Sequence, residues 1–372
     1  MMDLSVEICG LRFPNPVLPA AGPPVWSGEA MLACVRGGAG GIVSKTISTT
    51  GAQVPQPCMA EYGRGSMLNT ELWAEWPPER YIEHEYPKAR EAGVPLIISL
   101  GYTAEDVAAL APRVRPFADA LELSTHYIGD DPAPMVEAIR AAKDAVDVPV
   151  FVKFSPFRDV RRAAEAAQRA GADGIVAVNS YGPCLGIDVE TGLPLMGSRE
   201  GYGWLSGTAL KAIALRCVFD IAQTVDLPIF GVGGIQSGPD AVEFFMAGAH
   251  AVQVCTAAIL QGPEVFGKIV RQLEAWLASH GYASLEEVRG LTLRRLRERP
   301  FRTEHIPPIL DVEACTGCTR CVTSCVYGAL EMVGEPRTPT YKVRLLAERC
   351  WGCGLCATRC PTRALRMPGV SA

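Results

Sequence analysis

Eight cysteines near the C-terminus fall in two runs of identical spacing, and this pattern constrains the fold more than any other feature of the 372-residue chain. The first run extends from Cys315 to Cys325 and the second from Cys350 to Cys360, each as C-x-x-C-x-x-C-x-x-x-C. Three thiolates at this spacing reach three irons of one 4Fe-4S cluster, and the fourth cysteine of each run binds the other cluster. We therefore expect a tail with two 4Fe-4S clusters, the first held by Cys315, Cys318, Cys321 and Cys360, and the second by Cys350, Cys353, Cys356 and Cys325.

Zinc and disulfides are the alternative uses of so many cysteines. Two zinc sites would more often include histidine or use pairs that lie farther apart. Disulfides would require export, but the N-terminus has no basic segment followed by an apolar stretch. No apolar run approaches the roughly 20 residues of a membrane span. We expect a cytoplasmic protein without a membrane partner, in which most of the other six cysteines are small buried side chains.

The first 280 residues alternate short β-branched runs with longer amphipathic stretches, as in repeated βα units around a parallel sheet. Eight such units in a span near the typical size of roughly 250 residues favour a closed (β/α)₈ TIM barrel over an open sheet. The expected strands are residues 17–21, 41–46, 95–100, 120–125, 149–154, 174–179, 228–233 and 251–256. The expected helices are residues 104–117, 132–146, 158–170, 208–224, 239–247 and 264–279.

Two long loops and a change of composition complete the expected organisation. The segments 48–78 and 181–206 follow the second and sixth strands, and their Gly and Pro content is typical of a mobile cover over a binding site. Beyond residue 280 the pattern changes toward the cysteine-rich tail. We expect a barrel domain of residues 1–300 and a bacterial ferredoxin-like cluster domain of residues 301–372.

The carboxyl ends of the expected strands are where the chemistry of such barrels occurs. They carry small, hydroxyl and lysine residues, among them Lys45 and Lys153. The run Phe230-Gly-Val-Gly-Gly-Ile ends the seventh strand with glycines and opens a helix, which matches the corner where many barrels hold a phosphate on backbone N–H groups. A tight turn without a ligand is the alternative for this glycine run taken alone.

Several stretches together carry a family resemblance: Gly41–Thr46, Leu68–Glu71, the FVKFSP run around Lys153, Gly171–Gly174, Asn179-Ser180, Ser206–Leu210 with Ala214–Arg216, and the GVGGI turn. In these stretches the chain resembles the dihydroorotate dehydrogenase-like FMN barrel family. With the two-cluster tail, the resemblance is greatest to the catalytic subunit of bacterial dihydropyrimidine dehydrogenase. It implies an FMN site formed by Ala20, Ala21, Lys45, Thr46, Lys153, Ser206, Gly207, Gly233, Gly234, Cys255 and Thr256. A lysine such as Lys153 can stabilise the negative charge that develops on a reduced flavin.

The fourth strand departs from the family, whose members read Asn-Leu-Ser-Cys-Pro there with the cysteine as acid or base. This chain reads Glu122-Leu-Ser-Thr125-His126. We expect Thr125 or His126 to supply the proton, His126 because its ordinary pKa lies near neutrality. The resemblance implies a substrate shell of Asn69, Asn179 and Ser180, with Thr103 and Glu122 in place of two asparagines. Because a carboxylate lacks the paired donor and acceptor that an amide presents to a pyrimidine, we expect another small unsaturated substrate.

The expected activity is electron transfer between clusters and FMN, and hydride transfer between FMN and a C=C or CH–CH bond. No G-x-G-x-x-G turn occurs in a nucleotide-binding unit, so a reductase subunit or a ferredoxin is the expected electron partner. We also expect a homo-oligomer. A net charge of −5 disfavours a nucleic acid partner, including a role on RNA uridines. The alternatives are a uracil or thymine reductase with a rewired acid, and an electron-transfer subunit with a degenerate active site.

Overall fold

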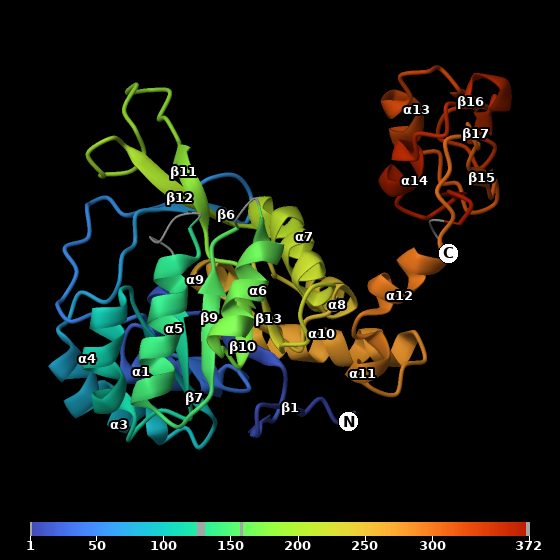
Figure 1. The fold of residues 1–372 in the computed structure, drawn as a ribbon. Helices are drawn as coiled ribbons and strands as arrows, with labels where there is room; N and C mark the ends of the chain where they lie inside the picture. The colour runs from blue at the N-terminus through green and yellow to red at the C-terminus, as the bar shows by residue number, and fades with distance from the viewer. Residues whose placement is uncertain (1, 125–130, 157–158, 370–372) are drawn as a thin grey trace. The chain divides into compact units, whose positions relative to one another are not determined.

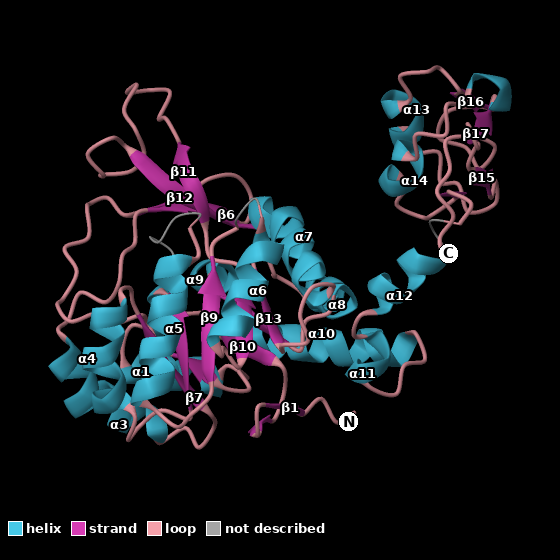
Figure 2. Cartoon of the chain, viewed as in Figure 1, coloured by secondary structure: helices cyan, strands magenta, loops and turns pink. Residues whose placement is uncertain are grey.

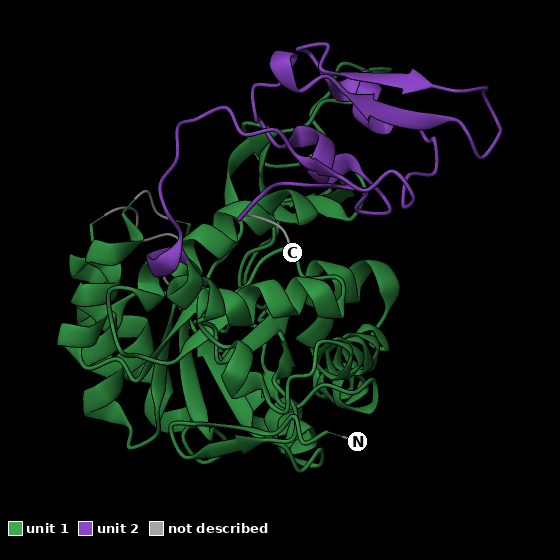
Figure 3. Ribbon diagram, turned by 90° about the vertical axis from the view of Figure 1, so that its right-hand side faces the viewer, with its two compact units in different colours: residues 1–295 green, residues 296–372 purple. Residues whose placement is uncertain are grey.

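The computed structural model describes residues 2–124, 131–156 and 159–369. The chain divides into two units, Met1–Arg295 and Leu296–Ala372 (Figure 3), which we describe separately. Among the described residues, no helix is both long and apolar enough to cross a membrane.

The first unit is built on eight parallel strands in the spatial order β3-β14-β13-β10-β9-β8-β7-β4 (Figure 2). The Gly40 N–H, just before β4, donates to the Val17 carbonyl of β3 over 2.9 Å, so the sheet nearly closes on itself. All eight expected strands are present, each shorter than its apolar run, and the expected barrel is confirmed. The strands are β3 (Val17–Pro19), β4 (Ile42–Val43), β7 (Leu96–Leu100), β8 (Ala120–Ser124), β9 (Val150–Phe154), β10 (Gly174–Ala177), β13 (Ile229–Val232) and β14 (Ala251–Val254).

Helices follow the strands and cover the outside of the barrel (Figure 1). Local sequence sets their ends: the Ser237 side chain accepts the Asp240 N–H and starts α8, and Gly248 at φ 114° ends it. The α-helices of this unit are α1 (Gly28–Arg36), α2 (Pro78–Arg80), α3 (Tyr86–Arg90), α4 (Ala104–Val114), α5 (Ala133–Ala145), α6 (Val160–Ala170), α7 (Lys211–Ala222), α8 (Gly238–Ala247), α9 (Thr256–Gln261), α10 (Val265–Ser279) and α11 (Leu285–Val288). Helix α12 (Leu291–Glu298) runs across the division between the units. Short 3₁₀ turns lie at Pro23–Val25 and Thr208–Leu210, and a π-helical turn at Tyr81–Glu85.

The interior of the barrel is filled from its amino end. Phe151 and Phe230 pack with ring centroids 5.0 Å apart, and Phe13 contacts Phe230 edge-on. Phe13 belongs to a hairpin of β1 (Val6–Ile8) and β2 (Leu11–Phe13), and all three rings are fully buried. Aromatic rings thus occupy the amino-end half, and the carboxyl ends of the strands are where the chemistry of such barrels occurs.

The two long loops form a sheet that the sequence did not predict. Strands β11 (Tyr181–Leu185), β12 (Tyr202–Gly207), β6 (Ser66–Asn69) and β5 (Met59–Glu61) pair antiparallel in that order. Figure 1 shows β6, β11 and β12 beyond the carboxyl end of β9. The expected mobile cover is therefore an ordered sheet, held by backbone hydrogen bonds between segments far apart in the chain.

The second unit is small and built around its cysteines. Helices α13 (Arg320–Ser324) and α14 (Leu355–Arg359) each lie within one cysteine run. The hairpin of β16 (Leu330–Val333) and β17 (Lys342–Leu345) separates the runs, and β15 (Ile309–Leu310) pairs with β18 (Leu365–Arg366). Its core contains few apolar side chains, namely Leu330, Val343 and Leu365 around Cys321. A core of this size needs additional cross-links, which metal clusters can provide.

Candidate functional site

A deep cavity opens at the carboxyl ends of the barrel strands, bordered by the ends of β3, β13 and β14 and by the sheet of the two loops. It brings together almost all of the residues predicted to contact FMN, although they come from six separate segments of the chain. Those that line the cavity are Ala20, Ala21, Thr46, Lys153, Ser206, Gly207, Gly233, Gly234, Cys255 and Thr256. Asn69, Asn179 and Ser180 of the predicted substrate shell also line it.

The glycine corner of the cavity has the backbone shape that a phosphate requires. Gly207, Gly233 and Gly234 have φ angles of 82°, 129° and 77°, which residues with a side chain rarely adopt. A Cβ on Gly207 would lie 2.3 Å from the Gly65 carbonyl oxygen, so no larger residue fits there. Beside them, the Thr256 hydroxyl donates to the Ser206 hydroxyl over 2.9 Å. Exposed backbone and hydroxyl groups of this kind suit the phosphate end of FMN.

Lys153 is the penultimate residue of β9 and lies inside the barrel, next to a fully buried carboxylate. Its ammonium lies 3.4 Å from Glu122 Oε1 and 3.4 Å from Gln253 Oε1. The Gln253 amide donates to Glu122 Oε2 over 2.7 Å. Lys153 and Gln253 line the cavity, whereas Glu122 lies beneath them with no exposed surface, so the structure places Glu122 outside the expected substrate shell. Gln253 was missed, although a polar residue inside the apolar run AVQVC was a usable signal.

Cys255 directly follows β14 and lies at the cavity wall. Burial raises the pKa of its thiol to about 11, so the group is neutral near pH 7. A Cβ on Gly22 would lie 2.8 Å from Cys255 Sγ. The thiol therefore packs against the Gly22 backbone and leaves the cavity to the ligand.

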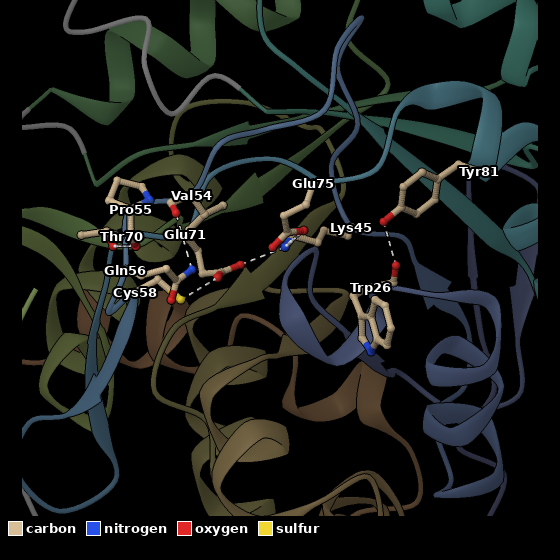
Figure 4. Close-up of polar contacts among 10 residues, drawn as sticks. All are labelled: Trp26, Lys45, Val54, Pro55, Gln56, Cys58, Thr70, Glu71, Glu75 and Tyr81. Carbon is tan, nitrogen blue, oxygen red and sulfur yellow. Dashed lines mark hydrogen bonds and ion pairs between the residues drawn. The ribbon is translucent and has the colours of Figure 1, made fainter. Parts of the chain in front are cut away.

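Lys45, which is predicted to contact FMN, is not among the residues that line the cavity. Its ammonium lies 2.9 Å from Glu71 Oε2 and 2.8 Å from Glu75 Oε2, two carboxylates of the segment after β6 (Figure 4). Burial acts to lower the pKa of Lys45, but the two carboxylates outweigh it and the net change is upward. Lys45 is therefore a fixed cation, and Glu71 takes its place in the cavity wall.

Cys58 holds the other oxygen of Glu71. Its thiol donates to Glu71 Oε1 over 3.3 Å, as Figure 4 shows. Burial and the nearby Glu71 raise the pKa of this thiol, which keeps the proton that makes the hydrogen bond. Both oxygens of Glu71 are thus bound by the protein, and sequence reasoning gave neither contact.

The remaining residues predicted to bind substrate or to act in catalysis differ in where the structure places them. Thr103 caps α4: it accepts the Asp106 N–H over 3.1 Å and donates to Asp106 Oδ2 over 2.9 Å, so the structure places it outside the cavity lining. Asn69 faces the cavity while its amide donates to the Trp204 carbonyl over 3.0 Å. Thr125 and His126 lie outside the described residues.

The second unit contains two separate cavities, each surrounded by four of the clustered cysteines. In the part of the chain that the structure describes, no three His, Cys, Asp or Glu side chains converge on the position of a single metal ion. Each set instead encloses a space, and each takes three thiols from one run and one from the other, as the spacing predicted. One cavity is lined by Cys315, Cys318, Cys321 and Cys360, and the other by Cys325, Cys350, Cys353 and Cys356. Four thiols around a small space fit a 4Fe-4S cluster.

Comparison with known proteins finds a matching family for each of the two units. Residues 3–277 match the family described as dihydroorotate dehydrogenase, and residues 314–364 match the 4Fe-4S dicluster domain. A protein of Methanothermobacter thermautotrophicus is 38% identical over 301 residues, covering 77% of this chain and 98% of its own. A Pyrococcus abyssi protein is 35% identical over 305 residues, covering 78% and 99%. Both relatives carry the name dihydroorotate dehydrogenase B (NAD(+)), catalytic subunit.

Proposed function

Because the chain belongs to the dihydroorotate dehydrogenase family and carries a 4Fe-4S dicluster domain, we propose that it passes electrons between its clusters and a small unsaturated compound bound beside FMN. It is an FMN-dependent oxidoreductase of CH–CH groups, with FMN and 4Fe-4S clusters as cofactors. When bound, FMN exchanges a hydride with substrate carbon and the clusters carry single electrons. We assign the flavin to residues 1–300 and the clusters to residues 301–372.

The observation that carries the proposal is the cavity at the carboxyl ends of the strands. All residues that the family resemblance assigns to FMN line it, except Lys45. The glycine corner would hold the phosphate. Lys153, 5% exposed, would place a positive charge against the flavin ring, where it favours the reduced, anionic form.

Asn69, Asn179 and Ser180 would bind the substrate from the wall shared by β6 and the end of β10. The Asn179 side chain oxygen accepts the Ser180 N–H over 2.9 Å, which leaves its NH₂ group for a substrate acceptor. The proton would come from Thr125 or His126, which follow β8 directly. Ser124, the last residue of β8, lines the cavity and supports this position for the acid.

The identity of the substrate and of the electron partner is a separate part of the proposal. We propose a small compound other than a standard pyrimidine, with electrons supplied by a reductase subunit or a ferredoxin. The relatives are named catalytic subunits, which supports a separate electron-transfer partner. A second candidate is reduction of uracil or thymine, as in the dihydropyrimidine dehydrogenases that the combination of barrel and tail resembles. The relatives' name makes dihydroorotate the third compound to test.

Anaerobic reoxidation of the reduced protein tests this proposal. The purified protein would be reduced with dithionite, freed of excess reductant, and mixed with single unsaturated compounds while flavin absorbance is recorded. We expect bound FMN at about one per chain, and reoxidation by at least one compound but not by its saturated analogue. A protein that binds FMN but is reoxidised by none would be an electron-transfer subunit. A protein that takes up no FMN on reconstitution would refute the flavin site.

A further inference from the structure

The ion pairs beside the cavity carry an excess of negative charge. One buried ammonium, that of Lys45, serves two carboxylates, with Nζ to oxygen distances of 2.9 Å to Glu71 and 2.8 Å to Glu75 (Figure 4). The side chains of Lys45 and Glu71 are 4% and 14% exposed, so water screens this cluster weakly. The group as a whole therefore has a formal charge of −1.

Glu71 presents this charge to the cavity. It lines the wall together with Asn69, whereas Lys45 lies behind it. Among the described residues that line the cavity, the other charged side chain is Lys153, which has the buried carboxylate of Glu122 3.4 Å away. A ligand that enters this cavity thus meets Glu71 directly, and it meets each ammonium group already next to a protein carboxylate.

The cluster of Lys45, Glu71 and Glu75 would affect the binding of an anionic ligand and of a neutral ligand in different ways. A carboxylate ligand could pair with Lys45 only by displacing the half-exposed Glu75 or by displacing Glu71, which would leave the largely buried Glu71 side chain charged and unpaired. A neutral ligand with an N–H or O–H group can instead donate to the outer lone pairs of Glu71, and hydrogen bonds to a charged acceptor are the stronger kind. The cluster therefore selects by charge.

On the basis of the proposed function, we infer that Glu71, fixed by Lys45 and Cys58, is a specificity-determining residue that admits uncharged hydrogen-bond donors and excludes carboxylates. Dihydroorotate, after which the relatives are named, is a carboxylate at neutral pH. The inference therefore separates the substrate of this chain from theirs.

Orotate and uracil are the matched probes, because they differ only in the carboxylate. Each would be titrated into the FMN-loaded protein, with the change in flavin absorbance as the measure of binding, which requires no turnover. We expect uracil to bind wild-type protein at least about tenfold more tightly than orotate, a difference equivalent to about 1.4 kcal/mol.

Two variants release Lys45. Glu71→Gln combined with Glu75→Gln keeps the side-chain shapes but removes both carboxylates, so orotate affinity should rise at least about tenfold while uracil affinity stays level or falls. Glu75→Gln alone, at a half-exposed side chain, should give a smaller gain in the same direction and covers the case in which the double variant does not fold. Glu79→Gln is the matched control, because Glu79 pairs with Arg113 over 2.8 Å outside the cavity lining, and it should change neither affinity.

The inference is overturned if wild-type protein prefers orotate, or if neither Glu71 and Glu75 variant gains orotate affinity, including the case in which no ligand perturbs the flavin. Failure of the proposed flavin site would give a different result, because a protein without bound FMN has no flavin spectrum at all. A flavin-loaded protein that binds orotate more tightly than uracil would refute only the charge selection.

Discussion

Replacing Lys153 by methionine would remove the cation beside the deepest carboxylate of the barrel. Met retains most of the stem of the lysine, so the main change is loss of the ammonium that lies 3.4 Å from Glu122 Oε1. In the described part of the chain this oxygen accepts no hydrogen bond, while Oε2 accepts one from Gln253 over 2.7 Å. The variant would therefore leave a fully buried carboxylate with one retained hydrogen bond.

The expected loss of unfolding free energy follows from burial. Exposed ion pairs contribute about 0–1 kcal/mol, but here the two side chains are 5% and 0% exposed. Removing one partner of a buried pair costs about 3–5 kcal/mol, because the remaining charge is uncompensated. Since Gln253 still donates to Glu122, we expect the lower end, about 3 kcal/mol.

Urea unfolding of the flavin-free protein, followed by tryptophan fluorescence, measures this loss without the contribution of FMN binding. All the tryptophans except Trp351 lie in the first unit, so the signal reports on the barrel. Lys143→Met is the matched control, because Lys143 pairs with Asp173 at a partly exposed site, and it should cost less than about 1 kcal/mol. Adding Glu122→Gln to Lys153→Met should recover most of the loss, since no buried charge remains.

The reasoning is refuted if Lys153→Met unfolds within about 1 kcal/mol of wild type, or if the double variant is no more stable than the single one. Either result would mean that the buried carboxylate is compensated by groups other than Lys153.

Three further predictions concern the clusters, the acid and the pH dependence of stability. Anaerobically purified protein should contain about eight irons and eight acid-labile sulfides per chain, and two zinc ions in a colourless protein would contradict this. His126→Ala or Thr125→Val should slow substrate-dependent flavin reoxidation by roughly 10²–10⁴-fold without preventing reduction through the clusters, and unchanged rates would move the acid elsewhere. Burial lowers the pKa of His250 from 6.5 to about 4. Between these pH values the unfolded chain binds a proton at His250 that the folded chain does not. The free energy of unfolding should therefore fall as the pH drops from about 6.5 to 4, by at most about 1.4 kcal/mol per pH unit. His250→Gln should lose this slope in urea unfolding, and an equal slope would exclude His250 as its origin.

The sequence predicted the barrel because each of its strands is a continuous apolar run, which a strand covered on both faces requires. Residues at the carboxyl ends of those runs, such as Gly233 and Thr256, could be assigned to the cavity because parallel strands end at one edge. Thr103 shows the limit of this reasoning. It also lies shortly after a strand, since β7 ends at Leu100, but its hydroxyl satisfies the N-terminus of α4 instead of a ligand.

The contacts that sequence reasoning missed join segments that are distant in the chain. Ser66–Asn69 pairs with Tyr202–Gly207, and neither stretch alternates clearly enough to indicate a strand by itself. Glu71 follows β6, so its place at the cavity depends on this pairing and on Lys45, which lies 26 residues earlier in the chain. Such a charge arrangement is a tertiary property, because no local pattern determines which lysine a loop carboxylate will meet.

The crossed cysteine sets have a consequence for how the protein matures. Each cavity of the tail draws one thiol from the other run, Cys360 for the first and Cys325 for the second. During synthesis the first run is made early, yet its set stays one ligand short until Cys360 has been added. If these sets hold the two clusters, as we propose, cluster insertion is tied to completion of the tail, and a chain interrupted between the runs can complete neither set. Loss of a single cysteine at either crossing point would likewise damage the half of the tail that is otherwise intact.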